Sequence, residues 1–471
     1  MYKSKLIRLY QTLDDSEIRQ LKKWIKSPIH NKHNDVQVLF EYLLSRKGIS
    51  SITTDRERVY QYLYPNKKMN MPRLRHVMSF ATDVLENFIR YIEYVSDKKN
   101  GEILLLRSFR KRDLRKDAEK QELALLDGLE NETIQNEEYY WTKYQLELES
   151  FRLQTDTDQP TSTNFHLQEV MNSSSLVFVL SILRYACISI THQNLFKTKY
   201  DIPFIDAILL EIEAGNYASI HSIQFYHACY MALTKPEVDD NYKRLKQYIV
   251  QYPDILPADE FRELYEMAIN YCIKRLNKGN RYYIEEAFDL YMNGIDHEVL
   301  LENGYLSHIA YKNTVAIGLH LEKFEEVKAL IPRGKDLLHL EYQESYVHYN
   351  TANFYFATKD YDKAIQLLIS MEYDDLFMTI GAKLLLLKIY VTEESFDLLE
   401  SFLHSFAQFV RRKSELSSTH KQSFLDTIRL TQKVVDAYTK KQKVALIEEI
   451  TATNPLPEKR WLLERLGVVS T

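Results

Sequence analysis

Apolar residues recur at intervals of three and four along most of the chain, and polar start signals precede several of these stretches. Asp14 and Glu17 form an Asp-x-x-Glu capping pair, in which the first side chain accepts an otherwise unpaired backbone N–H and the second reaches back. Thr54 and Glu57 form a second such pair. Pro72 stands in the first turn of a long apolar stripe, where its missing N–H costs little. The pattern predicts a succession of amphipathic helices.

Composition extends this prediction to the whole chain. Glycine and proline number 11 each among 471 residues, whereas average usage would give about 33 and about 24. Turn-dense β architectures need both residues at regular intervals, so their scarcity favours helices joined by short turns. Hydrophobic residues make up 45% and charged residues 27%, which is typical of a globular chain. We therefore predict an all-α protein.

A polar stretch at residues 97–101 predicts a domain boundary. Residues 1–97 are expected to form a small basic helical domain, and residues 101–471 an irregular α-solenoid of antiparallel helix pairs. The C-terminal helical cap of this second region includes residues 454–457 and a short helix carrying Trp461.

Small or aliphatic residues recur within apolar helical stretches of the second region, at spacings of 42, 43, 43, 37 and 35 residues. A repeat of this length suits paired antiparallel helices that stack on the next pair. A compact side chain at a fixed helix position lets the partner helix approach closely. The positions taken as equivalent are Cys187, Cys229, Cys272, Val315, Ala352 and Leu387.

Residues 349–368 closely resemble one tetratricopeptide repeat. The matching features are a small residue in the first helix, a tyrosine three positions later, an Asp-Tyr turn and a small residue in the second helix. They are Ala352, Tyr355, Asp360 with Tyr361, and Ala364.

Neighbouring segments look like degenerate copies of this repeat. Residues 311–331 and 383–402 resemble whole repeats, and residues 284–288 resemble a second helix. The best repeat spans about residues 345–376, and the resemblance covers about residues 260–405. It implies a right-handed helical solenoid with a concave groove, and protein or peptide binding as its role.

The resemblance also implies where a ligand would bind. In peptide-binding tetratricopeptide repeats, Lys and Asn on the first helix of each pair clamp a terminal carboxylate. The corresponding positions are Lys312, Asn313, Asn350 and Asn353. Ala316 stands where an asparagine partnering Lys312 is expected, so the set is incomplete. The alternative is that these four are ordinary solvated helix residues.

The front of the chain resembles a set of proteins from Bacteroidota that have no assigned function. The resemblance is carried by residues 24–32, 35–43, 59–65 and 73–79, and it covers about residues 5–95. It indicates membership of a bacterial family and implies no activity.

A basic cluster lies between two predicted helices near residue 70. A helix, a Pro-Asn-Lys-Lys turn and a second helix with arginines near its start are features of a helix-turn-helix. In that arrangement Arg73 and Arg75 would reach base edges, while Lys67 and Lys68 would touch phosphates. Against it, the connection is longer than the usual three to four residues or so, and a solvated surface explains the same residues.

Charge is distributed unevenly. The net charge is −5, yet residues 1–120 contain 26 Lys and Arg against 15 Asp and Glu, so the remainder is acidic. A basic front is typical of contact with nucleic acid or a membrane surface. Attraction between two parts of the same chain explains it equally well, and we expect no membrane partner.

No catalytic, cofactor or metal site is predicted. The chain has no GxxxxGKS or GxxxxGKT, GxGxxG, GxSxG or HExxH, and no Cys/His zinc spacing. We therefore expect a protein that is not an enzyme. The leading hypothesis is a scaffold that binds a protein or peptide in its groove, and the alternative is a nucleic-acid-binding regulator.

The sequence favours a cytoplasmic protein. Its three cysteines, an odd number without a CxxC motif, suit a reducing compartment. The first residues lack the apolar region of a signal peptide. The most apolar stretch, residues 176–190, is shorter than the 20 or so residues of a membrane span and predicts a buried helix.

Overall fold

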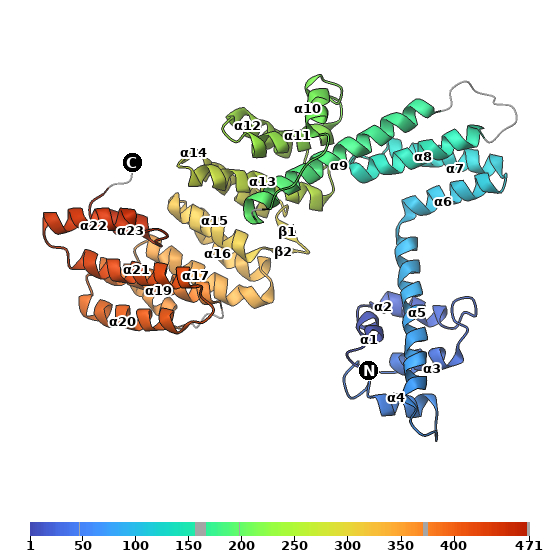
Figure 1. Cartoon of the computed structure of the whole chain (residues 1–471), viewed down its shortest axis with the longest axis horizontal. Coiled ribbons are helices and arrows are strands. Elements are labelled where there is room, and N and C mark those ends of the chain that lie inside the picture. The colour runs from blue at the N-terminus through green and yellow to red at the C-terminus, as the bar shows by residue number, and fades with distance from the viewer. Residues whose placement is uncertain (47, 156–165, 197, 371–374, 469–471) are drawn as a thin grey trace. The chain divides into compact units, whose positions relative to one another are not determined.

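The computed structural model describes residues 1–46, 48–155, 166–196, 198–370 and 375–468 (Figure 1). Within these ranges the regular structure is helical apart from one antiparallel hairpin, β1 Leu301–Glu302 with β2 Tyr305–Leu306. The prediction of an all-α protein is confirmed. The chain forms two compact units, Met1–Ser181 and Ile182–Thr471.

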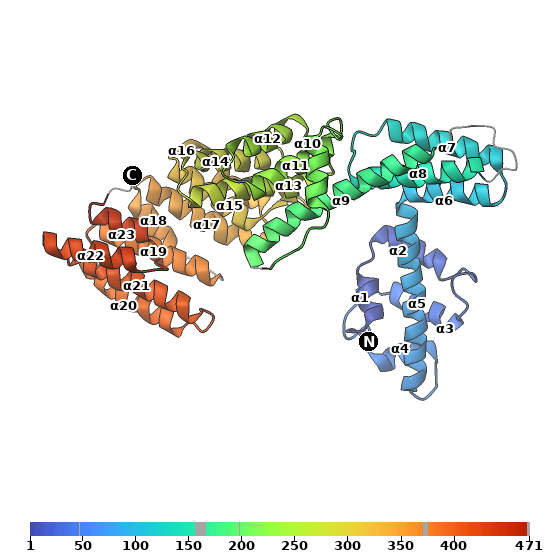
Figure 2. The same ribbon diagram turned by 45° about the horizontal axis from the view of Figure 1, so that its top comes forward.

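The helices of the first unit include α9, which continues into the second. They are α1 Lys5–Gln11, α2 Asp15–Trp24, α3 Asn34–Leu44, α4 Arg56–Leu63, α5 Met71–Ser96, α6 Lys98–Lys111, α7 Arg115–Glu130, α8 Glu137–Thr155 and α9 Leu167–Phe196. Figures 1 and 2 show α1 to α4 gathered around α5.

From α11 onward, each helix of the second unit packs on the next one along the chain. The helices of this unit are α10 Ile205–Glu213, α11 His221–Thr234, α12 Asp239–Gln251, α13 Ala258–Asn277, α14 Tyr282–Asp296, α15 His308–His320, α16 Phe324–Leu337, α17 Leu340–Ala357, α18 Tyr361–Ser370, α19 Leu376–Thr392, α20 Phe396–Arg412, α21 Ser418–Val435, α22 Lys440–Ala452 and α23 Lys459–Arg465.

One of the two predicted caps is confirmed and the other is wrong by one residue. Asp14 accepts the backbone N–H groups of Ser16 and Glu17, and Glu17 accepts that of Asp14. At α4, however, the N-cap is Asp55. Thr54 is fully buried, and its hydroxyl donates a hydrogen bond to the backbone carbonyl of Ser50. The carboxylate of Asp55, an equally good cap, therefore caps α4 instead.

The polar break expected at residues 97–101 is a single residue. Helix α5 ends at Ser96, and Asp97 caps α6 by accepting the backbone N–H of Asn100 at 3.1 Å. The remaining polar residues form the first turn of α6. The expected boundary therefore falls inside the first unit, between two consecutive helices.

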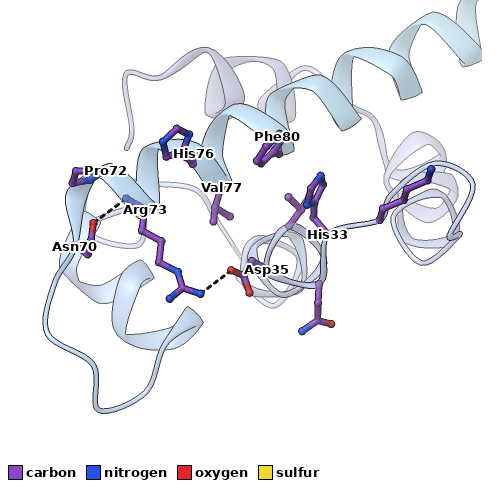
Figure 3. A pocket seen from close by; sticks show the side chains of 11 residues that line it. His33, Asp35, Asn70, Pro72, Arg73, His76, Val77 and Phe80 are labelled. Atoms are coloured by element: carbon purple, nitrogen blue, oxygen red, sulfur yellow. Dashed lines mark hydrogen bonds and ion pairs between the residues drawn. The ribbon is translucent and has the colours of Figure 1, made fainter.

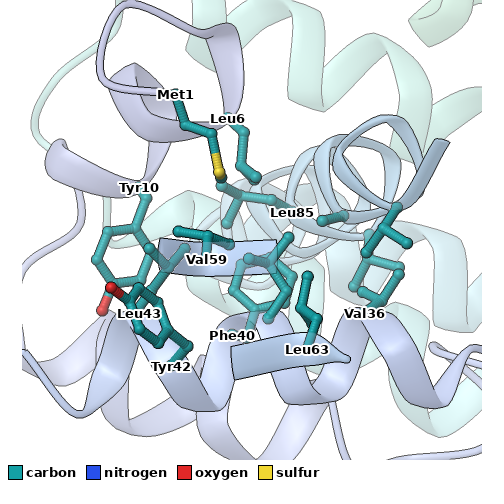
Figure 4. Close-up of a cluster of buried hydrophobic side chains, with 14 of the residues drawn as sticks. Met1, Leu6, Tyr10, Val36, Phe40, Tyr42, Leu43, Val59, Leu63 and Leu85 are labelled. Carbon is teal, nitrogen blue, oxygen red and sulfur yellow. The ribbon is translucent and has the colours of Figure 1, made fainter. Parts of the chain in front are cut away.

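Residues 1–97 nevertheless have a hydrophobic core of their own. Every member of this cluster lies between Met1 and Ile92. Figure 4 shows Leu6, Val59 and Leu85, from α1, α4 and α5, among its buried side chains. Helix α1, which the sequence pattern did not predict, contributes two of its fully buried residues.

The residues taken as repeat equivalents occupy equivalent places. They lie on alternate helices, α9, α11, α13, α15, α17 and α19, and each has 0% exposure. The second-helix positions of the resembling segments are buried too, at 0% or 1% exposure. These are Ala287, Val327, Ala364 and Leu399.

Four turns between paired helices share one backbone geometry. In each, a residue with positive φ ends the first helix, and the following N–H donates to the carbonyl five residues back, as in a Schellman motif. The positive-φ residues are Gly279, Glu322, Lys359 and Glu394, with φ of 94°, 58°, 63° and 54°. The donor–acceptor pairs are Asn280–Arg275, Lys323–Gly318, Asp360–Tyr355 and Ser395–Tyr390.

Helix α9 differs from the buried helix expected over residues 176–190. Leu180, Leu183 and Cys187 are buried, but only 28% of the most apolar stretch within Leu167–Gln193 is buried, and its mean hydropathy is 1.7. By length and composition alone, this one described helix could cross a membrane.

Candidate functional site

The four residues expected to bind a peptide lie on two packed helices, Lys312 and Asn313 on α15 and Asn350 and Asn353 on α17. Asn350 is 1% exposed, so a peptide cannot reach its side chain. Asn353 donates to the backbone carbonyl of Tyr349 at 2.9 Å. The four thus lie on the first helices of two successive pairs, and the cavities described below are lined by other residues.

The four residues expected to contact nucleic acid are exposed at the α4–α5 connection and the start of α5. Arg73 lies 3.9 Å from the ring centre of Tyr64, and its Nη2 is 3.4 Å from Oδ2 of Asp35. The hydroxyl of Tyr64 donates to the same carboxylate. Burial, and then Asp35, raise the pKa of Tyr64. Arg73 therefore helps to hold α5 on α3.

The other three basic side chains are freer. Lys67 lies 5.8 Å from the ring centre of Tyr64. Lys68 and Arg75 are exposed, and neither makes an ion pair with any residue that the structure describes. These two are the residues of the cluster that remain available to an anionic partner.

A cavity of about 540 Å³ opens between the start of α3 and the first turns of α5 (Figure 3). Lys32, Arg73 and His76 line it, and the ring of His33 stacks on Phe80 with centroids 4.3 Å apart. Its single carboxylate, Asp35, is already engaged by Arg73 and Tyr64. Basic side chains beside an exposed ring are suited to a phosphate backbone with a stacked base.

A larger cavity, of about 700 Å³, lies in the second unit where α12 ends, α13 begins and α14 ends. We refer to it as the α12–α14 cleft. Phe261, Tyr265 and Leu290 form its buried floor, and the hydroxyl of Tyr265 donates to the carbonyl of Leu290 at 2.8 Å. Val250, on its wall, is 71% exposed. The floor is fixed by the packing of α13 on α14.

The two cations that line the α12–α14 cleft each have a carboxylate partner. Nζ of Lys246 is 2.7 Å from Oε2 of Glu286, and Nη2 of Arg262 is 3.5 Å from Oε1 of Glu302. Burial opposes the charge on Glu286, but hydrogen bonds from Lys246, Tyr242 and Tyr282 outweigh it and hold its pKa below the usual value. Among the described lining residues, both Lys246 and Arg262 are therefore compensated by a carboxylate.

Three carboxylates at the same cleft are open. Asp254, Asp289 and Glu298 line it and are exposed. None of them makes an ion pair with another described residue. The unpaired charge at the mouth of the cleft is therefore negative.

A second cavity, of about 360 Å³, continues the cleft along α12. Lys246 and Val250 line both cavities, and Tyr282, 60% exposed, lines the second. The two together form an elongated groove with an apolar floor at one end.

Sequence reasoning missed the α12–α14 cleft because its residues come from three helix ends and two connections. The spacing of the repeat equivalents carried a signal. Cys229, Cys272 and Val315 are 43 residues apart, against 37 and 35 for the later repeats. The connection 297–307 accounts for the extra residues of the second interval and 252–257 for part of those of the first, and both connections contribute lining residues to the cleft.

The three cysteines are free and buried. Burial raises the pKa of Cys272 to about 12 and that of Cys187 well above its usual value. Thiols held protonated in this way are poor nucleophiles and poor metal ligands. Over the ranges that the structure describes, no group of three or more His, Cys, Asp or Glu side chains could hold a metal ion.

No protein-family model, curated protein or solved structure matches this chain.

Proposed function

We propose that the helix pairs of the second unit form a scaffold similar to tetratricopeptide repeats, that it binds a protein or peptide, and that it is not an enzyme. The observation that carries this proposal is the repetition of one geometry. Each positive-φ turn residue lies seven positions after a fully buried repeat equivalent, in four successive helix pairs. Stacked pairs of this kind bury a continuous core and present extended surfaces that suit protein ligands.

The charges of the second unit favour binding over catalysis. Glu286, a buried carboxylate beside the α12–α14 cleft, accepts hydrogen bonds from Tyr242, Lys246 and Tyr282, and these keep the carboxylate charged. A general acid or base instead needs a pKa near the working pH. The three buried, free cysteines are consistent with a cytoplasmic location, which we also propose.

Affinity capture from the host with the tagged full chain tests this function. A defined protein recovered with and without nuclease, which the purified chain then binds with a micromolar or lower Kd, would support it. Recovery of nucleic acid alone, or of nothing above the level of an unrelated helical bait, would refute it.

A second function is favoured by the α3–α5 cavity. Its basic lining, its His33–Phe80 stack and the two free cations nearby suit a single-stranded nucleic acid. The residues to change are Lys68 and Arg75, because Arg73 also contacts Asp35 and Tyr64 and helps to hold α5 on α3. The double substitution Lys68→Glu with Arg75→Glu should weaken binding of a fluorescent 20-nucleotide strand and flatten its dependence on salt.

The matched control changes the same amount of charge elsewhere. Lys440 and Lys441 are exposed on α22 and make no ion pair with a described residue. Their double substitution by Glu should leave the salt dependence unchanged. If both double variants weaken binding equally, the front cavity is not the site, and if the unmodified chain binds no strand, this second function is wrong.

A further inference from the structure

The α12–α14 cleft has the dimensions of a site for a side chain rather than of a packing gap. Its volume of about 700 Å³ lies within the range of roughly 300–1,000 Å³ typical of ligand pockets. Phe261, Tyr265 and Leu290 supply an apolar floor. Ala258, at the first position of α13, lines the wall with no more than a methyl group. A large apolar side chain would bury its surface there.

The groove extends beyond what a compact ligand would use. The second cavity begins at Lys246 and Val250 and runs on to Tyr282. An occupant that fills the deep end and follows α12 must be elongated. An extended peptide has this form, with one side chain in the floor and its neighbours along the groove.

The unpaired charges at the cleft indicate which kind of peptide would bind there. Both cations at the cleft are compensated by Glu286 and Glu302, whereas Asp254, Asp289 and Glu298 are open. Complementary charge raises the association rate and excludes like-charged partners. The second unit as a whole is also acidic, with 40 Asp and Glu against 33 Lys and Arg in residues 182–471.

We propose that the α12–α14 cleft binds a peptide segment in which a large apolar residue is flanked by Lys or Arg. This proposal rests on the scaffold function and specifies its ligand. The apolar residue occupies the floor over Phe261 and Tyr265, and the flanking cations face Asp254, Asp289 and Glu298. It locates binding at the edge of the repeats that carries the connections 252–257 and 297–307.

The test starts from the full chain and a phage-displayed library of random dodecapeptides. Selection is run in parallel on the unmodified chain and on Ala258→Trp, which fills the cleft from an exposed position without changing the core. Ala445→Trp, at an exposed position of α22, is the matched control. All three proteins should show the same helical circular dichroism and melting temperature.

We expect peptides enriched on the unmodified chain and on Ala445→Trp to carry a Trp, Phe, Leu or Met with two or more basic neighbours. The same sequences should be lost on Ala258→Trp. Enrichment that is equal on all three proteins, enrichment of acidic or wholly polar sequences, or no enrichment would each overturn the proposal.

The peptide with the highest affinity is then used to measure how much the carboxylates of the cleft contribute to binding. In fluorescence anisotropy at low salt, Asp254→Asn with Asp289→Asn should raise Kd by about three- to tenfold, as for two partly exposed ion pairs. Asp397→Asn with Glu400→Gln removes two exposed charges on α20 and should leave Kd unchanged. Equal effects of the two pairs would show that only the overall charge matters and would overturn the assignment of these carboxylates.

The scaffold function can survive the failure of this inference. A host partner that binds Ala258→Trp as tightly as the unmodified chain would place the partner site elsewhere on the repeats. The absence of any host partner would instead refute the scaffold function itself.

Discussion

Replacing Glu149 with Gln should destabilise the first unit more than the loss of any exposed ion pair. Glu149 lies on α8 with a fully buried side chain, and it accepts hydrogen bonds from three arginines. Nε of Arg107 lies at 2.8 Å, Nε of Arg110 at 3.0 Å and Nη1 of Arg152 at 2.9 Å. Burial opposes its charge, but the bonds from Arg107 and Arg110 outweigh burial and lower its pKa.

The magnitude follows from what the substitution leaves behind. Breaking a buried pair by removing one partner costs about 3–5 kcal/mol, because the remaining charge is buried and uncompensated. Arg107 and Arg152 are 32% and 42% exposed and can turn to water, whereas Arg110 is 13% exposed. We therefore expect about 3 kcal/mol, the lower end of that range. At about 2–4 °C per kcal/mol for a unit of this size, the melting temperature falls by roughly 6–12 °C.

Differential scanning calorimetry of the full chain measures this fall in melting temperature, with the unfolding transition of the first unit followed separately from that of the second unit. Glu119→Gln is the control, because Glu119 pairs with Arg115 at 2.9 Å on an exposed face of α7 and should contribute less than about 1 kcal/mol. A Glu149→Gln transition that falls no further than that of Glu119→Gln would refute the reasoning. Because the folded pKa is lowered, the contribution of Glu149 is present above the unfolded pKa and is lost as pH falls through the folded value.

Three further predictions address the second unit and the front segment. His227 is 5% exposed, neither ring nitrogen has a described hydrogen-bond partner, and burial lowers its pKa. Below about pH 6.5 this histidine is protonated in the unfolded chain but stays neutral in the folded chain, so the free energy of unfolding falls as the pH falls. Urea titrations over this pH range should show the decrease, and His227→Leu should remove the part that His227 causes. Gly279→Ala should cost about 1 kcal/mol in urea unfolding, because φ there is +94°, whereas Gly128→Ala, on the open surface of α7, should gain roughly 0.5–1 kcal/mol. Residues 1–97 expressed alone should melt cooperatively by circular dichroism, since their core is self-contained; a gradual, sloping melt would contradict this.

Local chemistry explains what the sequence revealed. The Asp14–Glu17 cap and the helix that starts at Pro72 depend on interactions within one turn, so they can be read from a few residues. The repeat equivalents could be found because a position that faces a neighbouring helix must stay compact and apolar. All six lie on alternate helices, and all six are fully buried.

Features that depend on distant contacts were missed. The resemblance indicates a turn at Asp360 and Tyr361, but not the positive φ that three of the four shared turns adopt. Those residues are Glu322, Lys359 and Glu394, residue types that give no turn signal of their own. Their conformation is imposed by the two helices that they join. Thr54 is likewise a residue type that often caps helices, but the residues around it bury its side chain, and Asp55 caps α4 instead. Asn350 matches a ligand position of the resembling repeat, yet it lies inside the packing.

The cleft is the most informative of these misses, because its origin is visible in the repeat spacing. Where the connection between pairs is short, as at residues 338–339 between α16 and α17, one pair closes directly on the next. Between α12 and α13, and between α14 and α15, the longer connections 252–257 and 297–307 lie outside the helix pairs, and the second includes the hairpin β1–β2. Both contribute lining residues, Asp254 from the first and Glu298 from the second. In repeat proteins, insertions collect on one face, which is often the binding face. The added length therefore supplies part of the walls of the cleft and two of its three unpaired carboxylates, while the floor beneath, fixed by Tyr265, is ordinary repeat core.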